Sequence, residues 1–150
     1  MNMHDWSNGF LVEVGGYVLG LAEASPETAG YWEGVERDEL RVKQCGQCST
    51  FLHPRRIVCS GCGSCALAWK KSAGRGTIYT YSRVHRSPRP EFKDSLPYVV
   101  GIVRLEEEVY LFSRLFAKEP TEVKIGAPVR VEFRRLETGV KLPVFAVAAA

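Results

Sequence analysis

The sequence predicts a mainly β fold in which a small cysteine-bearing module precedes a five-stranded barrel. Two Cys-x-x-Cys knuckles lie in the first half of the chain, and five strand-like runs separated by turns fill the second half. The chain has 150 residues, of which 45% are apolar and 25% charged, as in a globular protein. Such a chain makes one domain, or two small domains that share an interface.

An N-terminal hairpin is expected first, because two apolar runs flank Gly15-Gly16 within residues 10–22. Much of this hairpin has no polar face, so it packs either on the barrel or on another subunit. The run is interrupted by Glu13 and lacks a preceding basic segment, and is therefore interpreted as neither a signal peptide nor a membrane span.

A short helix should follow, starting at Ser25-Pro26-Glu27, since serine caps a helix and proline fits its first position. Tyr31, Trp32 and Val35 would form its apolar side. Aromatic side chains at this spacing usually serve packing. On so short a helix Tyr31 and Trp32 are also candidate anchors for docking a partner protein.

The knuckles Cys45-Gly-Gln-Cys48 and Cys59-Ser-Gly-Cys62 are separated by ten residues, expected to form a short β-hairpin. This spacing lets four thiolates converge on one tetrahedral zinc ion. A site closed by four cysteines keeps no position for water or substrate, so its expected contribution is to folding. We therefore predict structural zinc on Cys45, Cys48, Cys59 and Cys62.

The fifth cysteine, Cys65, continues the pattern as Cys62-Gly-Ser-Cys65 and could replace Cys62 as a ligand. We interpret it as a spare thiol, because the symmetric pair is already complete. An odd cysteine count with two knuckles favours zinc over disulfides and indicates a reducing, cytoplasmic location.

Strand patterns account for most of the remaining chain. Leu40–Gln44 alternates and leads into the first knuckle, and Phe51, Leu52, Ile57 and Val58 would give the following hairpin an apolar side. Five strands fit a Greek-key barrel of the OB type. They are expected at Gly76–Val84, Tyr98–Leu105, Val109–Phe116, Val129–Leu136 and Val144–Ala148. The chain is thus divided into residues 1–38 (extension and helix), 39–72 (zinc ribbon) and 73–150 (OB-fold domain).

The charge is uneven along the chain. Residues 44–90 hold eight Lys or Arg and no Asp or Glu, whereas the rest holds twelve basic and seventeen acidic residues. This segment is either a solvated surface or an anion site for a nucleic acid backbone or the phosphates of a cofactor such as coenzyme A. The candidate contacts are Arg55, Arg56, Arg83, Arg86 and Arg89.

Tyr79, Tyr81 and Arg83 alternate and so are expected to share one face of the first barrel strand, where they stack on bases or cover the core. Catalytic signatures such as a Gly-rich phosphate loop, Gly-x-Ser-x-Gly or His-Glu-x-x-His do not occur in the sequence. His85 and Cys65 have no neighbouring residues arranged as catalytic partners. The chain on its own is not expected to be an enzyme.

The sequence resembles a family of small bacterial and archaeal proteins that join a rubredoxin-like zinc ribbon to an OB-fold domain, known as domain of unknown function 35. The resemblance covers about residues 29–147. Its marks, besides the knuckles, are Tyr31-Trp-Glu-Gly34, His53-Pro-Arg55, Gly74-Arg-Gly-Thr-Ile-Tyr-Thr-Tyr81, Leu96-Pro-Tyr-Val-Val-Gly101 and Ile125-Gly-Ala-Pro-Val129.

The resemblance implies a non-catalytic accessory subunit of a thiolase-superfamily enzyme, such as a thiolase, acyltransferase or retro-aldolase, acting on coenzyme A thioesters. A dimeric thiolase core would give a heterotetramer. A nucleic-acid-binding module is the alternative, although a sequence pI near 8.6 is modest for that role. An independent enzyme that uses Cys65 or His85 is a third reading.

Overall fold

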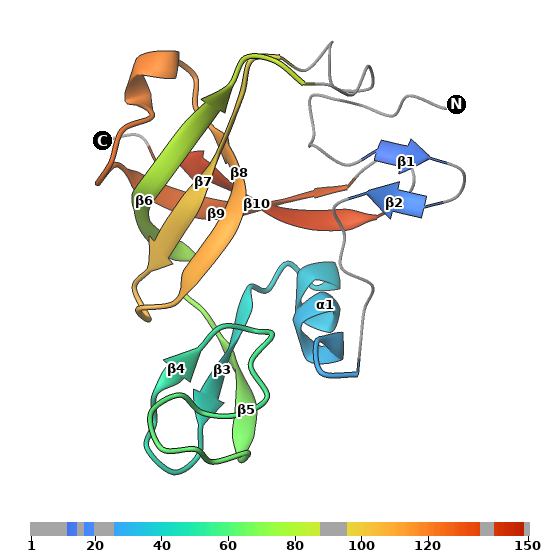
Figure 1. Ribbon diagram of the computed structural model, residues 1–150, viewed down its shortest axis with the longest axis vertical. Coiled ribbons are helices and arrows are strands. Elements are labelled where there is room, and N and C mark those ends of the chain that lie inside the picture. The colour runs from blue at the N-terminus through green and yellow to red at the C-terminus, as the bar shows by residue number, and fades with distance from the viewer. Residues whose placement is uncertain (1–11, 15–16, 20–25, 88–95, 136–139, 149–150) are drawn as a thin grey trace.

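The computed structural model describes residues 12–14, 17–19, 26–87, 96–135 and 140–148. In this part of the chain the fold is mainly β, with one short α-helix, a three-stranded ribbon and a closed five-stranded barrel. Figure 1 shows the barrel above the ribbon, with the helix beside both. The predicted fold class is confirmed. None of the described helices is long and apolar enough to cross a membrane.

The N-terminal hairpin is present in the backbone. Strands β1 (Val12–Val14) and β2 (Tyr17–Leu19) pair antiparallel, with Val14 opposite Tyr17. The Gly15-Gly16 dipeptide that suggested the turn lies outside the described residues.

Helix α1 spans Ala29–Glu36 with Thr28 as its N-cap, so the predicted start at Ser25-Pro26 is wrong. Residues 26–28 form a turn instead. The Glu27 carbonyl accepts a hydrogen bond from the Lys43 ammonium at 2.9 Å, and the Thr28 carbonyl accepts the first helical bonds. A distant side chain therefore fixes the residues before the helix, which a local capping pattern does not reveal.

The ribbon is a sheet of order β4-β3-β5. The central strand β3 (Arg41–Cys45) pairs antiparallel with β4 (Phe51–Leu52) on one side and β5 (Leu67–Lys71) on the other. The hairpin expected between the two knuckles is wrong, because β4 pairs back with the strand before the first knuckle. After β4, Pro54 has no amide to donate and the chain turns, with the Arg56 amide bonded to the His53 carbonyl at 2.9 Å.

The barrel consists of β6 (Arg75–Val84), β7 (Tyr98–Leu105), β8 (Tyr110–Phe116), β9 (Pro128–Arg135) and β10 (Lys141–Val147). Its order is β10-β8-β7-β6-β9, closed by the β9–β10 pair and with β8 and β10 parallel, which is the arrangement of an OB fold. A 3₁₀ helix, η3 (Pro120–Glu122), lies between β8 and β9.

Strand β10 starts at Lys141, three residues before the predicted start, and includes Pro143 opposite Phe133 of β9. On its other side β10 pairs with β8 only at Phe145 and Ala146. A proline is tolerated where one neighbouring strand is missing.

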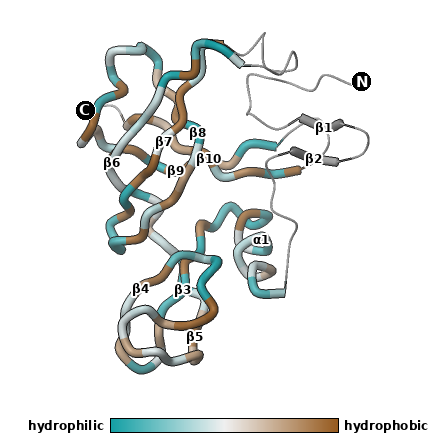
Figure 2. The backbone as a smooth tube through the Cα atoms, viewed as in Figure 1, coloured by the Kyte–Doolittle hydropathy of each residue, from teal (hydrophilic) through white to brown (hydrophobic). Residues whose placement is uncertain are grey.

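The core of the molecule crosses from ribbon to barrel. Leu40 and Val42, next to and within β3, belong to the same buried cluster as the inward residues of the barrel strands, and Phe51 packs against it. Figure 2 shows hydrophobic residues along the barrel strands and continuing into β3 and β4. The boundary proposed at residue 72 therefore falls between β5 and β6, but the packing does not stop there.

Strand β6 carries a register shift between Ile78 and Thr80. Ile78 is buried, Tyr79 and Thr80 are exposed, and Tyr81 packs against the core. The prediction that Tyr79 and Tyr81 share one face is therefore wrong, because the bulge at Tyr79 inverts the alternation.

Candidate metal centre and the loop beside it

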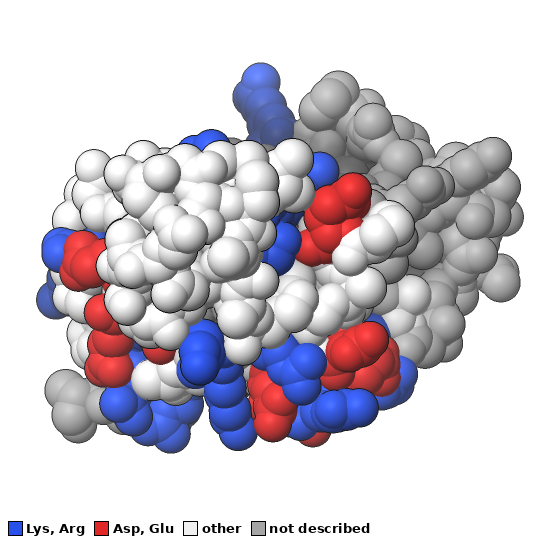
Figure 3. Space-filling model, turned by 90° about the horizontal axis from the view of Figure 1, so that it is seen from below, with Lys and Arg blue, Asp and Glu red and all other residues white. Residues whose placement is uncertain are grey.

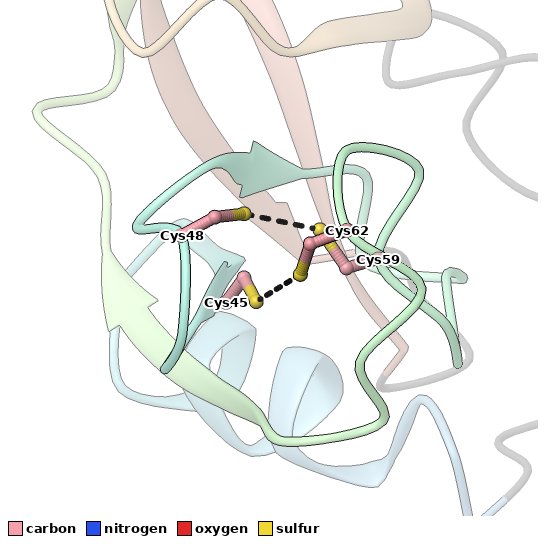
Figure 4. Close-up of side chains that lie close together, drawn as sticks. All are labelled: Cys45, Cys48, Cys59 and Cys62. Carbon is pink, nitrogen blue, oxygen red and sulfur yellow. Dashed lines mark hydrogen bonds between the residues drawn. The ribbon is translucent and has the colours of Figure 1, made fainter.

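Four cysteine side chains converge at the end of the ribbon (Figure 4). Their sulfur atoms all lie within 4.8 Å of one another, with Cys45 Sγ 3.6 Å from Cys62 Sγ and Cys48 Sγ 3.5 Å from Cys59 Sγ. Sulfurs at the corners of a tetrahedron around zinc lie about 3.8 Å apart, given a Zn–S bond near 2.3 Å. The four cysteines are positioned to hold one metal ion.

These contacts are far too long for disulfide bonds, which need about 2.05 Å between sulfurs, and all five cysteines are free thiols. Cys45 and Cys59 are buried, while Cys48 and Cys62 are exposed. Cys65 is exposed and lies outside the group of four that could hold a metal.

Each knuckle aims a backbone amide at its first sulfur. The Gln47 amide lies 3.4 Å from Cys45 Sγ, and the Gly61 amide lies 3.3 Å from Cys59 Sγ. A Cβ added at Gly61 would lie 3.2 Å from Thr50 Oγ1, which is tighter than an ordinary van der Waals contact, so this turn favours glycine. Amides directed at the sulfurs favour thiolates over thiols.

The thiols themselves show why a cation suits this site. Hydrogen bonds from the Thr50 hydroxyl and amide lower the pKa of Cys48 to about 6. The Ser64 amide lowers the pKa of Cys62. The neighbouring sulfurs of Cys45 and Cys48 oppose this effect, and the pKa rises above its usual value to about 12. Four thiolates this close repel one another, and a divalent ion removes that conflict. The donor set fits zinc.

A loop of residues 53–58 runs from β4 to the second knuckle. We call it the docking loop, because Arg55 and Arg56 within it are candidate partner contacts. Buried Leu52 and Cys59 hold its two ends. Inside the loop, His53 Nδ1 accepts a hydrogen bond from the Arg55 amide at 3.1 Å. Burial, followed by the charges of Arg55 and Arg56, lowers the pKa of His53.

The side chain of Lys43 holds this loop in place. The side chain is only 7% exposed, and its ammonium donates to the Arg56 carbonyl at 2.8 Å and to the Glu27 carbonyl at 2.9 Å. It also lies 4.7 Å from the centre of the Trp69 ring. Burial lowers the pKa of Lys43. One buried cation thus joins the turn before α1, the docking loop and β5.

The predicted basic contacts do not form one surface. Arg55 and Arg56 lie on the docking loop, whereas Arg83 and Arg86 lie at the far end of β6, and Arg89 lies outside the described residues. The Arg83 guanidinium donates to the Pro120 carbonyl.

Carboxylates from elsewhere in the sequence also reach the segment that contains no acids of its own. Glu39 lies 3.6 Å from Lys71, and Glu106 pairs with Arg75 at 3.0 Å. Figure 3 shows the resulting mixture of basic and acidic side chains along the edge of the molecule.

The two aromatic residues of α1 are placed differently. Tyr31 packs against the main core, and burial raises the pKa of its hydroxyl. Trp32 is half-buried and stacks edge-on against Tyr31, with the ring centres 5.0 Å apart. Both candidates for docking are therefore half-buried, and only Tyr31 is among the side chains packed against the main core.

Sequence reasoning missed the exposed apolar side chains near the docking loop. Ile57 and Val58, predicted to cover an apolar side of the ribbon, are 61% and 42% exposed. On the barrel, Tyr79 and Tyr110 stack edge-on with their ring centres 5.0 Å apart, and Phe112 is also exposed. The absent hairpin explains the exposure of Ile57 and Val58, and the unrecognised bulge explains that of Tyr79. Lys43 gave no signal because it alternates like any strand residue.

The comparisons with known proteins match both parts of this architecture. Residues 32–68 match the family described as the rubredoxin-like zinc ribbon domain of ChsH2, and residues 69–134 match its C-terminal OB-fold domain. A solved structure titled Ltp2-ChsH2(DUF35) aldolase is similar with a TM-score of 0.76 and 31% identity, over 86% of this chain and 100% of that chain.

Two relatives extend the comparison. A DUF35 domain-containing scaffold protein from Methanothermobacter thermautotrophicus is 37% identical over 112 residues, which are 73% of this chain and 84% of that protein. A probable enoyl-CoA hydratase alpha subunit from Thermomonospora curvata is 33% identical over 119 residues, which are 79% of this chain. The match spans only 37% of the length of that hydratase subunit.

Proposed function

The chain belongs to the DUF35 family of zinc-ribbon and OB-fold proteins, and from this premise we propose that it is a non-catalytic accessory subunit of a thiolase-like enzyme. In this role it stabilises the larger subunit and assists the binding of coenzyme A thioesters. The observation that carries the proposal is its similarity to the DUF35 chain of the Ltp2-ChsH2 aldolase, which is covered from end to end.

Zinc is proposed as a structural ion on Cys45, Cys48, Cys59 and Cys62. The donor set of four thiols at near-tetrahedral separations supports this assignment. Four sulfur ligands leave no coordination position for a substrate oxygen. The ion would supply folding energy to the ribbon, and the chemistry would belong to the partner subunit.

The names of the relatives support a partner enzyme. One is called a scaffold protein, another a hydratase alpha subunit, and the solved chain carries the name of a second protein, Ltp2, beside ChsH2. We propose a thiolase-superfamily partner. A dimeric enzyme core would place two copies of the chain in a heterotetramer.

The coenzyme A role is the finer part of the proposal. Arg83 and Arg86 at one end of the barrel, together with Arg89, are proposed contacts for phosphate groups or for the partner. Arg55 and Arg56 on the docking loop are proposed for the same two roles, and Tyr31 and Trp32 for partner contact.

Co-expression with the neighbouring genes tests the proposal. The full chain with an affinity tag should recover a thiolase-superfamily protein, identified by mass spectrometry, at a fixed stoichiometry through size-exclusion chromatography. If no such protein is recovered from cells that express both the tagged chain and the neighbouring genes, the proposed function is overturned.

The same preparation tests the two other functional classes. Salt-sensitive binding of single-stranded DNA or RNA by the isolated chain, with no enzyme recovered, would point to a nucleic-acid-binding module. Thioester hydrolysis by the isolated chain that Cys65→Ser or His85→Gln abolishes would point to an independent enzyme. The proposed function predicts neither result.

A further inference from the structure

The docking loop of residues 53–58 presents an unusual surface. Ile57 and Val58 are exposed by 61% and 42%, although both are large and aliphatic. Figure 2 shows a hydrophilic stretch followed by a hydrophobic one along the chain after β4. The hydrophilic stretch contains Arg55 and Arg56, which are also exposed.

The sequence on both sides of this loop contains few charged residues. Apart from the two arginines, residues 44–69 contain no Lys, Arg, Asp or Glu. Viewed from the ribbon end, Figure 3 shows a broad uncharged face bordered by charged side chains. Charged residues are depleted, and aromatic residues and arginine enriched, at the cores of protein interfaces.

The two arginines differ from most arginines of the barrel. Arg75, Arg104 and Arg134 each pair with a glutamate at 2.7–3.2 Å. Among the described residues, no carboxylate lies within ion-pair distance of Arg55 or Arg56. Two cations in an apolar setting are complementary to a carboxylate in an apolar setting.

A groove next to the loop provides further contact area. It has a volume of about 490 Å³ and is lined by His53, Arg56 and Ser60 from the ribbon side and by Glu108, Val109 and Tyr110 from the barrel. The Glu108 carboxylate is bonded to Arg104 at 2.7 Å, so it does not neutralise Arg56. Tyr110, which lines the groove, also stacks edge-on against Tyr79.

The loop is also held in one shape. Lys43 fixes the Arg56 carbonyl at 2.8 Å, the Arg56 amide closes the turn onto His53, and Cys59 enters the metal site directly after Val58. A preformed loop loses little entropy on binding, which is how a small surface achieves useful affinity.

We infer that the docking loop, with the groove beside it, is the contact through which this chain binds an apolar, carboxylate-bearing patch on its partner enzyme subunit. Lys43 is a positioning residue for this contact. The inference rests on the function proposed above, because it names the surface that the accessory subunit uses. The few charges on this face favour a protein over a nucleic acid backbone as the occupant.

The test uses the full chain and the thiolase-superfamily subunit recovered with it, expressed separately and titrated by calorimetry. Ile57→Ser combined with Val58→Ser, and Arg55→Glu combined with Arg56→Glu, should each weaken the Kd by about tenfold or more, as expected for hot-spot residues. The matched controls are Ile125→Ser, on a side chain that is 69% exposed, and Arg130→Glu on β9. Both controls should bind within about twofold of the parent chain.

Two further readouts separate docking from folding. All variants should retain one zinc per chain and the parent circular dichroism spectrum. The salt dependence of the Kd should reverse in the Arg55→Glu, Arg56→Glu variant, because salt then screens a repulsion and not an attraction. Lys43→Met should keep zinc yet weaken binding, because the Arg56 carbonyl loses its donor.

Unchanged affinity of both double variants would overturn the inference while the recovered complex leaves the proposed function intact. Two other results would also overturn it. One is loss of a homodimer, and not of the enzyme complex, in the Ile57→Ser, Val58→Ser variant. The other is occupation of the face by RNA, seen as nuclease-sensitive binding.

Discussion

The ribbon end and the barrel are stabilised by different means. The ribbon end buries only Cys45, Leu52 and Cys59, with Leu67 packed against them. Among the described residues, the main cluster contains twelve buried residues, of which all but Leu40 and Val42 come from the barrel domain, including Phe145, which is 1% exposed. Small modules rarely bury enough apolar surface to fold without a metal or disulfide. We therefore expect the ribbon end to depend on a bound metal for its stability, and the barrel to depend on packing.

The two regions also differ at their surfaces. Three arginines of the barrel, Arg75, Arg104 and Arg134, pair with nearby glutamates, while the two arginines of the ribbon end have no acidic partner in the described chain. On this basis we propose that the barrel holds the ribbon in place and that the ribbon end contacts the partner subunit.

Loss of zinc should have the largest effect, because it should unfold the ribbon end and leave the barrel folded. Structural zinc contributes apparent binding free energies of about 10–16 kcal/mol in zinc-finger peptides, so its loss should unfold the ribbon end. In Cys45→Ser, amide exchange should become fast at Cys59 and Gly46, whose amides are bonded within the ribbon, and stay slow in β7. Hydrogen exchange with mass spectrometry measures both.

The matched control for this substitution is Cys65→Ser, at an exposed cysteine outside the group of four. This variant should retain zinc and the parent exchange pattern. A soluble Cys45→Ser protein with full zinc content and a protected ribbon would contradict the assignment.

A substitution in the barrel core should have the opposite effect: it should destabilise the barrel and leave the zinc site intact. Phe145→Ala removes a fully buried ring and should lower the free energy of unfolding by about 3–5 kcal/mol. Denaturant unfolding measures this change, and zinc content in native buffer should stay at one per chain. Zinc loss in the folded variant would mean that the metal site is not stabilised separately from the barrel.

Leu40→Ala tests the junction between the two regions. The side chain is 2% exposed and belongs to the barrel cluster although it precedes the ribbon strand. Its truncation should cost about 2–5 kcal/mol and, unlike Phe145→Ala, should also weaken zinc affinity in a competition with a chelator. Unchanged zinc affinity would show that the shared core does not couple the regions.

The smallest expected effect concerns His53 and pH. Burial holds the pKa of His53 below its ordinary value, so the unfolded chain takes up a proton before the folded chain does. Stability should therefore fall as the pH drops from about 7 to about 5. His53→Gln should flatten part of this slope in thermal melts at fixed zinc, and an identical slope in the variant would show that the ring is not desolvated.

Much of the fold could be predicted because its patterns are local. The knuckle spacing and the strand-like runs of the barrel depend on neighbouring residues, and each predicted strand end lies within three residues of the observed end where this is described. The positions of the four sulfurs follow from the same local spacing.

The errors arose where distant residues decide. The helix start moved because Lys43 binds the Glu27 carbonyl, sixteen positions away. The face of β6 changed at a bulge that no residue pattern marks. The acid-free segment gained carboxylates from Glu39 and Glu106, which fold onto it. The periodicity of the sequence gives no information about such long-range contacts.

We propose that this chain supports a coenzyme A thioester site that it does not form alone. The most direct measurement titrates acetyl-CoA by calorimetry into the isolated chain, the isolated thiolase-superfamily subunit and their purified complex. The account predicts the tightest binding in the complex, weaker binding by the isolated enzyme subunit and none by the isolated chain. Equal affinity of the enzyme subunit with and without the chain, or binding and turnover by the isolated chain, would contradict it.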